Sequence, residues 1–336
     1  MYSIRTFFPS NEAPEMEMTA KKIYPPQLLP FQQPGDRINT AFAAAGIAVE
    51  KNGEPVGRLV LYAATGIAAG GEKTLVIGNY ECIDDDEAAA MLLEAAAGFA
   101  RMEKFRALIG PMNGTTWDTY RFCTSDQGDP FFSEMTHMPW YPAQWEKAGF
   151  VTLATYVSTI DRKLVCDGEE ILRTEKYFSG NGIRIRNIDL DNYERELKKI
   201  FPFCEKAFAG NFLYTPAGWE SFREKYLAIK NFILPEAVFI SENSSGEITA
   251  IAFNFPDHRC TKEKRLVVKT LARDPGKEFR GLGEVLANRT QRFAKENGYD
   301  AAIHALMYSD NYSLKLSGQY NGEIFRQYRL YSKTPA

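Results

Sequence analysis

Residues 271–286 read LARDPGKEFRGLGEVL and connect an apolar stretch, RLVVKT (265–270), to an amphipathic helical pattern. A strand, a glycine-containing turn and a helix in this order can bind a pyrophosphate, because the N–H groups at a helix N-terminus carry partial positive charge. Gly281 and Gly283 have no side chain, so an anion can approach the main chain closely there. Arg280 adds a full positive charge beside them. The segment therefore predicts a site for a phosphorylated ligand.

Length and charge limit the class of protein. The chain has 336 residues, of which 45% are hydrophobic, and this length fits about two domains with cores of their own. A formal net charge of −3 argues against bulk attraction to nucleic acid or to anionic membranes. The N-terminus lacks the apolar core of a signal peptide, and no stretch approaches the roughly 18 apolar residues of a membrane span. We therefore expect a cytoplasmic protein without nucleic-acid or membrane partners, of unknown oligomeric state.

Cysteine and histidine positions give no sign of a metal site. The five cysteines are widely separated and contain no C-x-x-C pair. This distribution is typical of reduced thiols in a cytoplasm. His137 and His258 lie in predicted loops without the spacing of metal ligands. The sequence therefore predicts a protein without a metal.

The predicted elements follow a similar order in the two halves. The N-terminal half is predicted to contain a hairpin over 42–64 that turns at Asn52-Gly53, a strand over 73–83, a helix over 84–103 and a strand over 107–112. The C-terminal half is predicted to contain a hairpin over 237–255, a strand over 265–272, a helix over 284–298 and strands over 301–307 and 325–333. Residues 8–38 are predicted to form an extended arm and loop, and 115–122 a short helix.

The sequence also repeats within these elements. Residues 73–77 read KTLVI and residues 264–268 read KRLVV, 191 positions later. Each stretch precedes a predicted helix and a short strand, beginning at Ala107 and at Ala302. Two unrelated α/β pieces with common element lengths could give the same pattern, but a hairpin before both units favours a duplication. We therefore expect two domains, 1–160 and 161–336.

The six residues Glu278–Gly283, EFRGLG, resemble the acetyl-CoA-binding motif Gln/Arg-x-x-Gly-x-Gly/Ala of the GNAT superfamily of acyltransferases. Both glycines match, and Pro275 lies three residues before the motif, as is frequent in the family. Glu278 departs from the usual Gln or Arg. The resemblance implies an α/β (α+β) fold of two tandem GNAT-like domains. Each would have a mixed, mostly antiparallel central sheet flanked by helices.

The same resemblance implies that acetyl-CoA or another acyl-CoA is a co-substrate. The family's main-chain contacts to the pantetheine arm and its phosphate-binding positions correspond here to Leu271, Arg273, Arg280, Gly281, Leu282 and Gly283. The matching N-terminal turn, ECIDDD (81–86), has no glycine and four carboxylates, which would repel a pyrophosphate. We therefore expect a coenzyme site in the C-terminal domain alone. The acids at 84–86 are interpreted as helix caps rather than metal ligands.

Candidate catalytic groups come from the region after the motif. The family often has an Asn early in the next helix and a Tyr seven residues later, which places Asp310 and Ser317 at these positions. Asn311 and Tyr320 lie nearby but out of register; Asn311 could contact the coenzyme or cap a helix, and Tyr320 could protonate the thiolate or pack beneath the last strand. Ser317 could act through water, and His304 could serve as a base near neutral pH or as a core residue.

These observations predict an N-acyltransferase that moves an acyl group directly from a thioester to a small amine or amino-acid-like acceptor. One alternative is a non-catalytic ligand-binding protein on the same scaffold, because the usual Tyr is absent and Glu278 replaces Gln or Arg. A second alternative is transfer of an aminoacyl group from tRNA, which a net charge of −3 does not favour.

Overall fold

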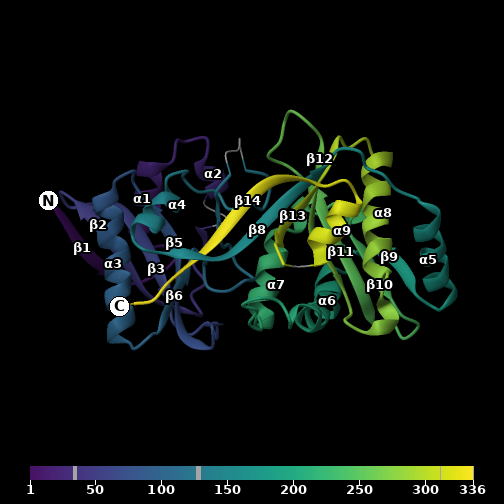
Figure 1. The fold of residues 1–336 in the computed structure, drawn as a ribbon, viewed down its shortest axis with the longest axis horizontal. Helices are drawn as coiled ribbons and strands as arrows, with labels where there is room; N and C mark the ends of the chain where they lie inside the picture. Colours follow the sequence, from purple (N-terminus) through teal and green to yellow (C-terminus); the bar gives the residue numbers. More distant parts are fainter. Residues whose placement is uncertain (33–35, 126–129, 311, 336) are drawn as a thin grey trace. The chain divides into compact units, whose positions relative to one another are not determined.

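The computed structural model describes residues 1–32, 36–125, 130–310 and 312–335, which form two compact units (Figure 1). The N-terminal unit comprises Met1–Thr155, Phe212–Thr215 and the C-terminal segment from Gln327. The C-terminal unit comprises Tyr156–Asn211 and Pro216–Arg326. The division into domains 1–160 and 161–336 stays a prediction.

The N-terminal unit is built on a mixed sheet with the strand order β1-β2-β3-β5-β6-β14. Its strands and helices in the first half of the chain are β1 (Tyr2–Phe7), α1 (Pro14–Ile23), α2 (Leu29–Gln32), β2 (Ala43–Lys51), β3 (Glu54–Tyr62), β4 (Ala68–Ala69), β5 (Glu72–Cys82), α3 (Asp86–Met102), β6 (Ala107–Gly110), β7 (Phe122–Cys123) and α4 (Tyr141–Lys147). The pair β5–β6 is parallel, whereas β1–β2, β2–β3, β3–β5 and β6–β14 are antiparallel.

The C-terminal unit repeats this plan with the strand order β8-β13-β12-β11-β10-β9. Its strands and helices are β8 (Val151–Asp161), α5 (Glu169–Gly180), β9 (Arg184–Asn187), α6 (Tyr193–Phe208), α7 (Trp219–Ala228), β10 (Phe239–Glu242), β11 (Ile248–Pro256), β12 (Arg265–Arg273), α8 (Leu282–Glu296), β13 (Ala301–Tyr308), α9 (Tyr312–Gln319) and β14 (Glu323–Lys333). The pair β12–β13 is parallel and the other pairs in this order are antiparallel. The predicted mixed, mostly antiparallel sheets flanked by helices are confirmed.

Each sheet is completed by a strand from the other half of the sequence. In the N-terminal unit, β14 pairs with β6, so that Tyr331 lies opposite Gly110. In the C-terminal unit, β8 pairs with β13, so that Ile160 lies opposite Ile303. The unit boundaries at Thr155 and Gln327 fall inside these two strands. The two halves therefore exchange their last strands.

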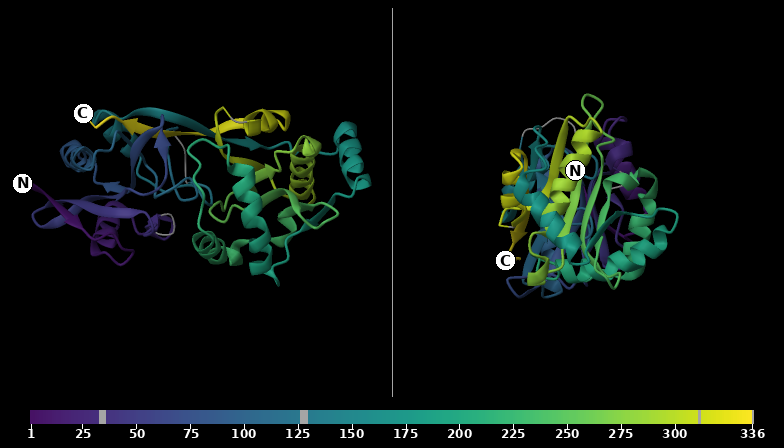
Figure 2. Two further views of the ribbon diagram at one scale, coloured as in Figure 1. Left: turned by 90° about the horizontal axis from the view of Figure 1, so that it is seen from below. Right: turned by 90° about the vertical axis from the view of Figure 1, so that its right-hand side faces the viewer.

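Helices cover both faces of the C-terminal sheet (Figure 2). On one face, Leu282, Val285 and Leu286 of α8 pack with Ala250 and Ala252 of β11 in one apolar core. On the other face, α6 and α7 lie against the sheet, and Tyr226 of α7 contacts the ring of Phe253 at 5.9 Å. Residues that alternate along β11 thus point to opposite helical layers.

The local sequence signals gave both correct and incorrect predictions. The hairpin at Asn52-Gly53 is confirmed, with φ angles of 56° and 82° that suit a tight two-residue turn. The extended arm predicted over 8–38 is wrong, because α1 and α2 form there and Pro14 occupies the first residue of α1, where a missing N–H costs nothing. The helix predicted over 115–122 is also wrong, because this segment is turns and the start of β7.

In the described part of the chain, no helix is both long enough and apolar enough to cross a bilayer.

Candidate functional site

The strands β12 and β13 diverge at the centre of the C-terminal sheet. They pair in parallel only from Arg265 with Ala301 to Val268 with His304. Beyond this point β12 continues beside β11, and β13 continues beside β8 after a shift in register between His304 and Met307. A wedge therefore opens between two neighbouring strands, directly before the glycine-containing turn.

The main chain of β12 faces this wedge at the positions predicted from the sequence. The N–H of Asp274 donates to the carbonyl oxygen of Thr249 on β11, at 2.8 Å. Because N–H and C=O groups alternate sides along an antiparallel strand, those of Leu271 and Arg273 point away from β11, toward the side that β13 has left. These two residues thus present an open strand edge to which an extended ligand with amide groups could bind.

The backbone conformation and the packing of the protein explain why residue 281 is a glycine. Its φ angle of 94° lies in the left-handed region, which side chains disfavour. A Cβ atom there would also come within 3.2 Å of Thr174 on α5. This glycine lets the chain turn from the loop into α8 and lets α5 pack closely against the turn.

Gly283 has no such explanation. It lies in the first turn of α8, and a Cβ atom placed on it would meet no heavy atom within 4 Å. A glycine in a helix costs roughly 1 kcal/mol relative to alanine. Open space above a helical glycine fits a ligand that must approach the main chain closely.

The first turn of α8 is open to an anion. Gly281 precedes the helix without providing a capping side chain, so the N–H groups of Leu282 and Gly283 have no partner within the helix. Lys277 and Arg280 are exposed, and within the described residues neither side chain forms an ion pair. The predicted positions Arg280, Gly281, Leu282 and Gly283 thus lie together around one helix terminus.

Two of the predicted catalytic side chains, those of His304 and Ser317, contact each other. His304 Nδ1 lies 2.7 Å from Ser317 Oγ of α9, and Ser317 Oγ lies 2.5 Å from Thr159 Oγ1 of β8. Gln291 Nε2 of α8 lies 3.3 Å from His304 Nε2. If the Gln291 amide donates to His304 Nε2, the other ring nitrogen carries the proton and donates to Ser317. The four side chains form a hydrogen-bonded chain that joins β8, β13, α8 and α9.

This chain is enclosed by protein. Ser317 is only 2% exposed, and Thr159 and Gln291 are each 1% exposed. Burial lowers the pKa of His304 to about 4, so the imidazole is neutral at pH 7. The expectation that His304 titrates near neutrality is therefore wrong, because removing the ring from water disfavours its charged form.

Tyr320 lies apart from the pair of Ser317 and His304. Its hydroxyl donates to the carbonyl oxygen of Glu284 in the first turn of α8, at 3.1 Å. Burial, together with Glu284 and Cys166, raises the pKa of Tyr320 to about 12, so the phenol stays protonated. Asn311 lies outside the described residues. The structure thus places Tyr320 beside the first turn of α8 and does not gather the three candidates into one group.

Sequence reasoning missed several partners of these residues. Gln291 and Thr159 hold the pair of His304 and Ser317, and Tyr312 donates from its hydroxyl to Glu284 Oε1 at 2.8 Å. No local sequence signal marks these side chains, because each lies far along the chain from the group that it contacts.

The corresponding wedge of the N-terminal unit is filled by its own chain. After β6, the N–H of Met112 donates to the carbonyl oxygen of Ile77 at 2.9 Å, and the N–H of Asn79 donates to Asn113 Oδ1 at 2.7 Å. A Cβ atom on Gly78 would lie 2.2 Å from the Met112 carbonyl oxygen. Main-chain groups of β5 beyond its pairing with β6 are therefore already bonded within the unit.

The first turn of α3 is capped rather than open. Asp85 accepts hydrogen bonds from the N–H groups of Glu87 and Ala88, each at 3.0 Å, which confirms the predicted capping role for this acid. The capped terminus contrasts with the uncapped terminus of α8. An anion at α3 would have to displace a carboxylate of the protein.

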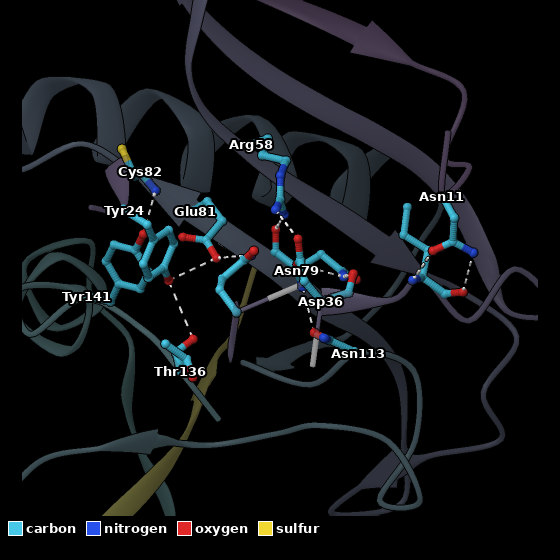
Figure 3. Close-up of polar contacts among 12 residues, drawn as sticks. Asn11, Tyr24, Asp36, Arg58, Asn79, Glu81, Cys82, Asn113, Thr136 and Tyr141 are labelled. Atoms are coloured by element: carbon cyan, nitrogen blue, oxygen red, sulfur yellow. Dashed lines mark hydrogen bonds and ion pairs between the residues drawn. The ribbon is translucent and has the colours of Figure 1, made fainter. Parts of the chain in front are cut away.

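Behind this turn lies a buried carboxylate, Glu81, shown in Figure 3. It is 4% exposed and accepts from Tyr24 at 3.1 Å and from Gln32 at 2.9 Å, as well as from Tyr141. Burial raises its pKa from 4.5 to about 7, although Arg58 opposes this shift. Tyr24 follows α1 and Gln32 lies in α2, so their hydrogen bonds to Glu81 connect this part of the chain to β5.

The buried Glu81 predicts a pH-dependent stability. Because its folded-state pKa exceeds its unfolded-state value, its contribution is fully present below about pH 4.5 and is lost as the pH rises through about 7. The loss approaches about 3 kcal/mol in unfolding free energy. Glu81→Gln mimics the protonated acid and is expected to flatten this dependence in thermal melts between pH 5 and pH 8. If the melting temperatures of wild type and Glu81→Gln change with pH in the same way, Glu81 is not the source of the pH dependence.

Comparisons with known proteins were made for the whole chain. No protein-family model matches the sequence, and no curated protein matches it. Several solved structures do match in fold. A GCN5-related glucosamine N-acetyltransferase region of a fungal multi-domain GH3 β-N-acetylglucosaminidase aligns with a TM-score of 0.60 and 11% identity over 99% of this chain, which spans 38% of that larger protein.

Two further structures match this chain over almost their full lengths. A tandem GNAT protein from the clavulanic acid biosynthesis pathway aligns with a TM-score of 0.55 and 12% identity, covering 99% of both chains. A GCN5-related N-acetyltransferase from Sphaerobacter thermophilus aligns with a TM-score of 0.52 and 12% identity, over 99% of this chain and 96% of that one. Identities this low show the fold alone. On that evidence the chain has the tandem fold of the GNAT superfamily, as the motif at Glu278–Gly283 predicted.

Proposed function

We propose that the C-terminal unit binds acetyl-CoA or another acyl-CoA and transfers the acyl group to an amine of a small-molecule acceptor. The observation that carries this proposal is Gly283, a helical glycine with open space where its side chain would be. The open edge of Leu271 and Arg273 suits the amide groups of a pantetheine arm, and the uncapped α8 with Arg280 suits its phosphates. The N-terminal unit lacks both features and is proposed to serve as scaffold.

The chemistry needs only a few groups of the protein. The neutral amine attacks the thioester carbon, a C–N bond forms, the C–S bond breaks, and the amine loses a proton to solvent water. The thiolate takes up a proton from Tyr320, the proposed donor, whose pKa of about 12 keeps it protonated beside the first turn of α8. Tyr320 then regains a proton from water. Ser317, which is buried, and His304, which is half-buried, are proposed to position α9 against β13.

Calorimetry with coenzyme A tests the proposal. Wild-type protein is expected to bind one coenzyme A per chain. Arg280→Glu is expected to weaken binding about tenfold or more, because it reverses a charge beside the phosphates. Lys295→Glu, the same reversal near the far end of α8, is the matched control and should bind like wild type. Absence of binding by wild-type protein would refute the proposal.

A ligand-binding protein without catalysis is the second candidate. The enclosure of Ser317, which occupies the family's Tyr position and is 2% exposed, favours it. Release of free thiol from acetyl-CoA in the presence of a panel of amines separates the two. Coenzyme binding without thiol release for any amine would favour the binding protein.

A further inference from the structure

The carboxylate of Glu278 lies within the turn that precedes α8. A Cβ atom placed on Gly276 would lie 2.8 Å from the carboxyl carbon and from both carboxylate oxygens of Glu278. Because the three distances are equal, the carboxylate lies flat across the α-carbon of Gly276. The side chain therefore folds back over the main chain of the turn, although Glu278 is an exposed residue.

Two cations near the turn, Lys206 and Arg273, have other partners, whereas Lys277 and Arg280 form no ion pair within the described residues. Lys206 of α6 is paired with Asp274 Oδ2 at 2.5 Å. The guanidinium of Arg273 donates to the carbonyl oxygens of Asp274 at 2.6 Å and Gly276 at 3.3 Å. Within the described ranges, no salt bridge joins Glu278 to a basic side chain. The Glu278 carboxylate attracts Lys206 electrostatically but forms no ion pair with it, in a turn whose other features suit an anion.

We propose that the Glu278 carboxylate competes with the diphosphate of the coenzyme for this turn and so limits the affinity for phosphorylated ligands. The inference rests on the proposed function, since it concerns the same site. Two like charges about 4 Å apart near a protein surface repel strongly enough to change binding about tenfold.

The proposal predicts that Glu278 weakens the binding of ligands that carry a diphosphate and does not affect ligands without one. Coenzyme A carries its diphosphate into the turn, whereas pantetheine has no phosphate and reaches only the wedge between β12 and β13. Removing the charge of Glu278 should therefore strengthen the binding of coenzyme A and leave that of pantetheine unchanged. The gain should also shrink as salt is added, because the site is exposed to solvent.

The test compares the full-length wild type with Glu278→Gln, which keeps the shape of the side chain and removes its charge. Glu296→Gln is the matched control, with the same charge change at the last residue of α8. Coenzyme A binding is measured by calorimetry at low and high salt, and pantetheine binding by ligand-observed NMR. We expect Glu278→Gln to bind coenzyme A about tenfold more tightly at low salt. Glu296→Gln should match wild type, and pantetheine should bind all three proteins equally.

Three results would overturn the proposal. If wild type binds coenzyme A and Glu278→Gln binds it equally, the competition by the carboxylate is refuted while the proposed function stands. If Glu278→Gln also binds pantetheine more tightly, by the same factor, the effect is not electrostatic and the proposal is again refuted. If no variant binds coenzyme A, the proposed function fails and this inference fails with it.

Discussion

Tyr331→Ala, a substitution five residues before the last residue, is expected to unfold the N-terminal unit and to leave the C-terminal unit folded. The Tyr331 side chain is 1% exposed, lies in the core of the N-terminal unit, and contacts the rings of Phe122 at 6.5 Å and Trp145 at 6.1 Å. Truncating a buried aromatic residue to alanine costs about 3–5 kcal/mol, which is a large share of the stability of one unit. Hydrogen exchange followed by mass spectrometry measures the outcome unit by unit.

The expected pattern is loss of protection in peptides from β6 and α3, with protection in α8 unchanged. Tyr331→Phe is the matched control, since it removes only the hydroxyl that donates to Glu146 Oε1 at 3.0 Å. A hydrogen bond to a charged carboxylate contributes about 1.5 kcal/mol, and this one is partly buried, so its loss costs less than the loss of the whole ring. Loss of protection confined to α8 and β13 would show that the last strand does not complete the N-terminal sheet.

Gly283→Val is expected to reduce coenzyme A affinity more than a hundredfold without destabilising the protein. The Cβ of the new side chain would meet no heavy atom within 4 Å beyond its chain neighbours and its own helix backbone, so we expect little effect on folding. It does fill the space through which phosphates would approach the N–H groups of α8. Calorimetry measures the affinity, and a thermal melt of the ligand-free variant checks that stability is equal to or above that of wild type.

Gly98→Val in α3 is the control for inserting valine at a helical glycine. Its Cβ would approach only the guanidinium of Arg101, at 3.7 Å. This variant should keep wild-type affinity for coenzyme A. Equal affinity of Gly283→Val and wild type would mean that the space above Gly283 is not used by the ligand.

The glycine-containing turn between β12 and α8 was predictable because its signals are local. Two glycines, a basic residue and the change from strand to helix all lie within one short stretch. The structure adds that the two glycines differ: Gly281 has a left-handed φ of 94° and close packing against α5, whereas Gly283 has neither. Sequence alone could not separate them, because the separating fact is which atoms from other segments lie nearby.

The candidate catalytic residues were less predictable for the same reason. The sequence does not show how much water reaches a histidine ring in an apolar strand. The lowered pKa of His304 arises from burial, and its ring nitrogens lie beside Gln291 of α8 and Ser317 of α9. Its partners Gln291 and Ser317 lie in two different helices. The register that brings them together is set by packing of whole elements.

By itself, the sequence determined the type of most elements, the internal repeat, the glycine-containing turn before α8 and the capping acid Asp85 before α3. These features depend on periodicity and turn chemistry, which act over a few residues. The tertiary structure alone decided that β14 completes the N-terminal sheet and β8 the C-terminal one. It also decided that Met112 and Asn113 fill the first wedge while the second stays open. The alternation of apolar residues along a strand predicts which face of the strand is buried. It does not predict which strand lies beside it, because strand pairing depends on contacts between segments that are distant in the sequence.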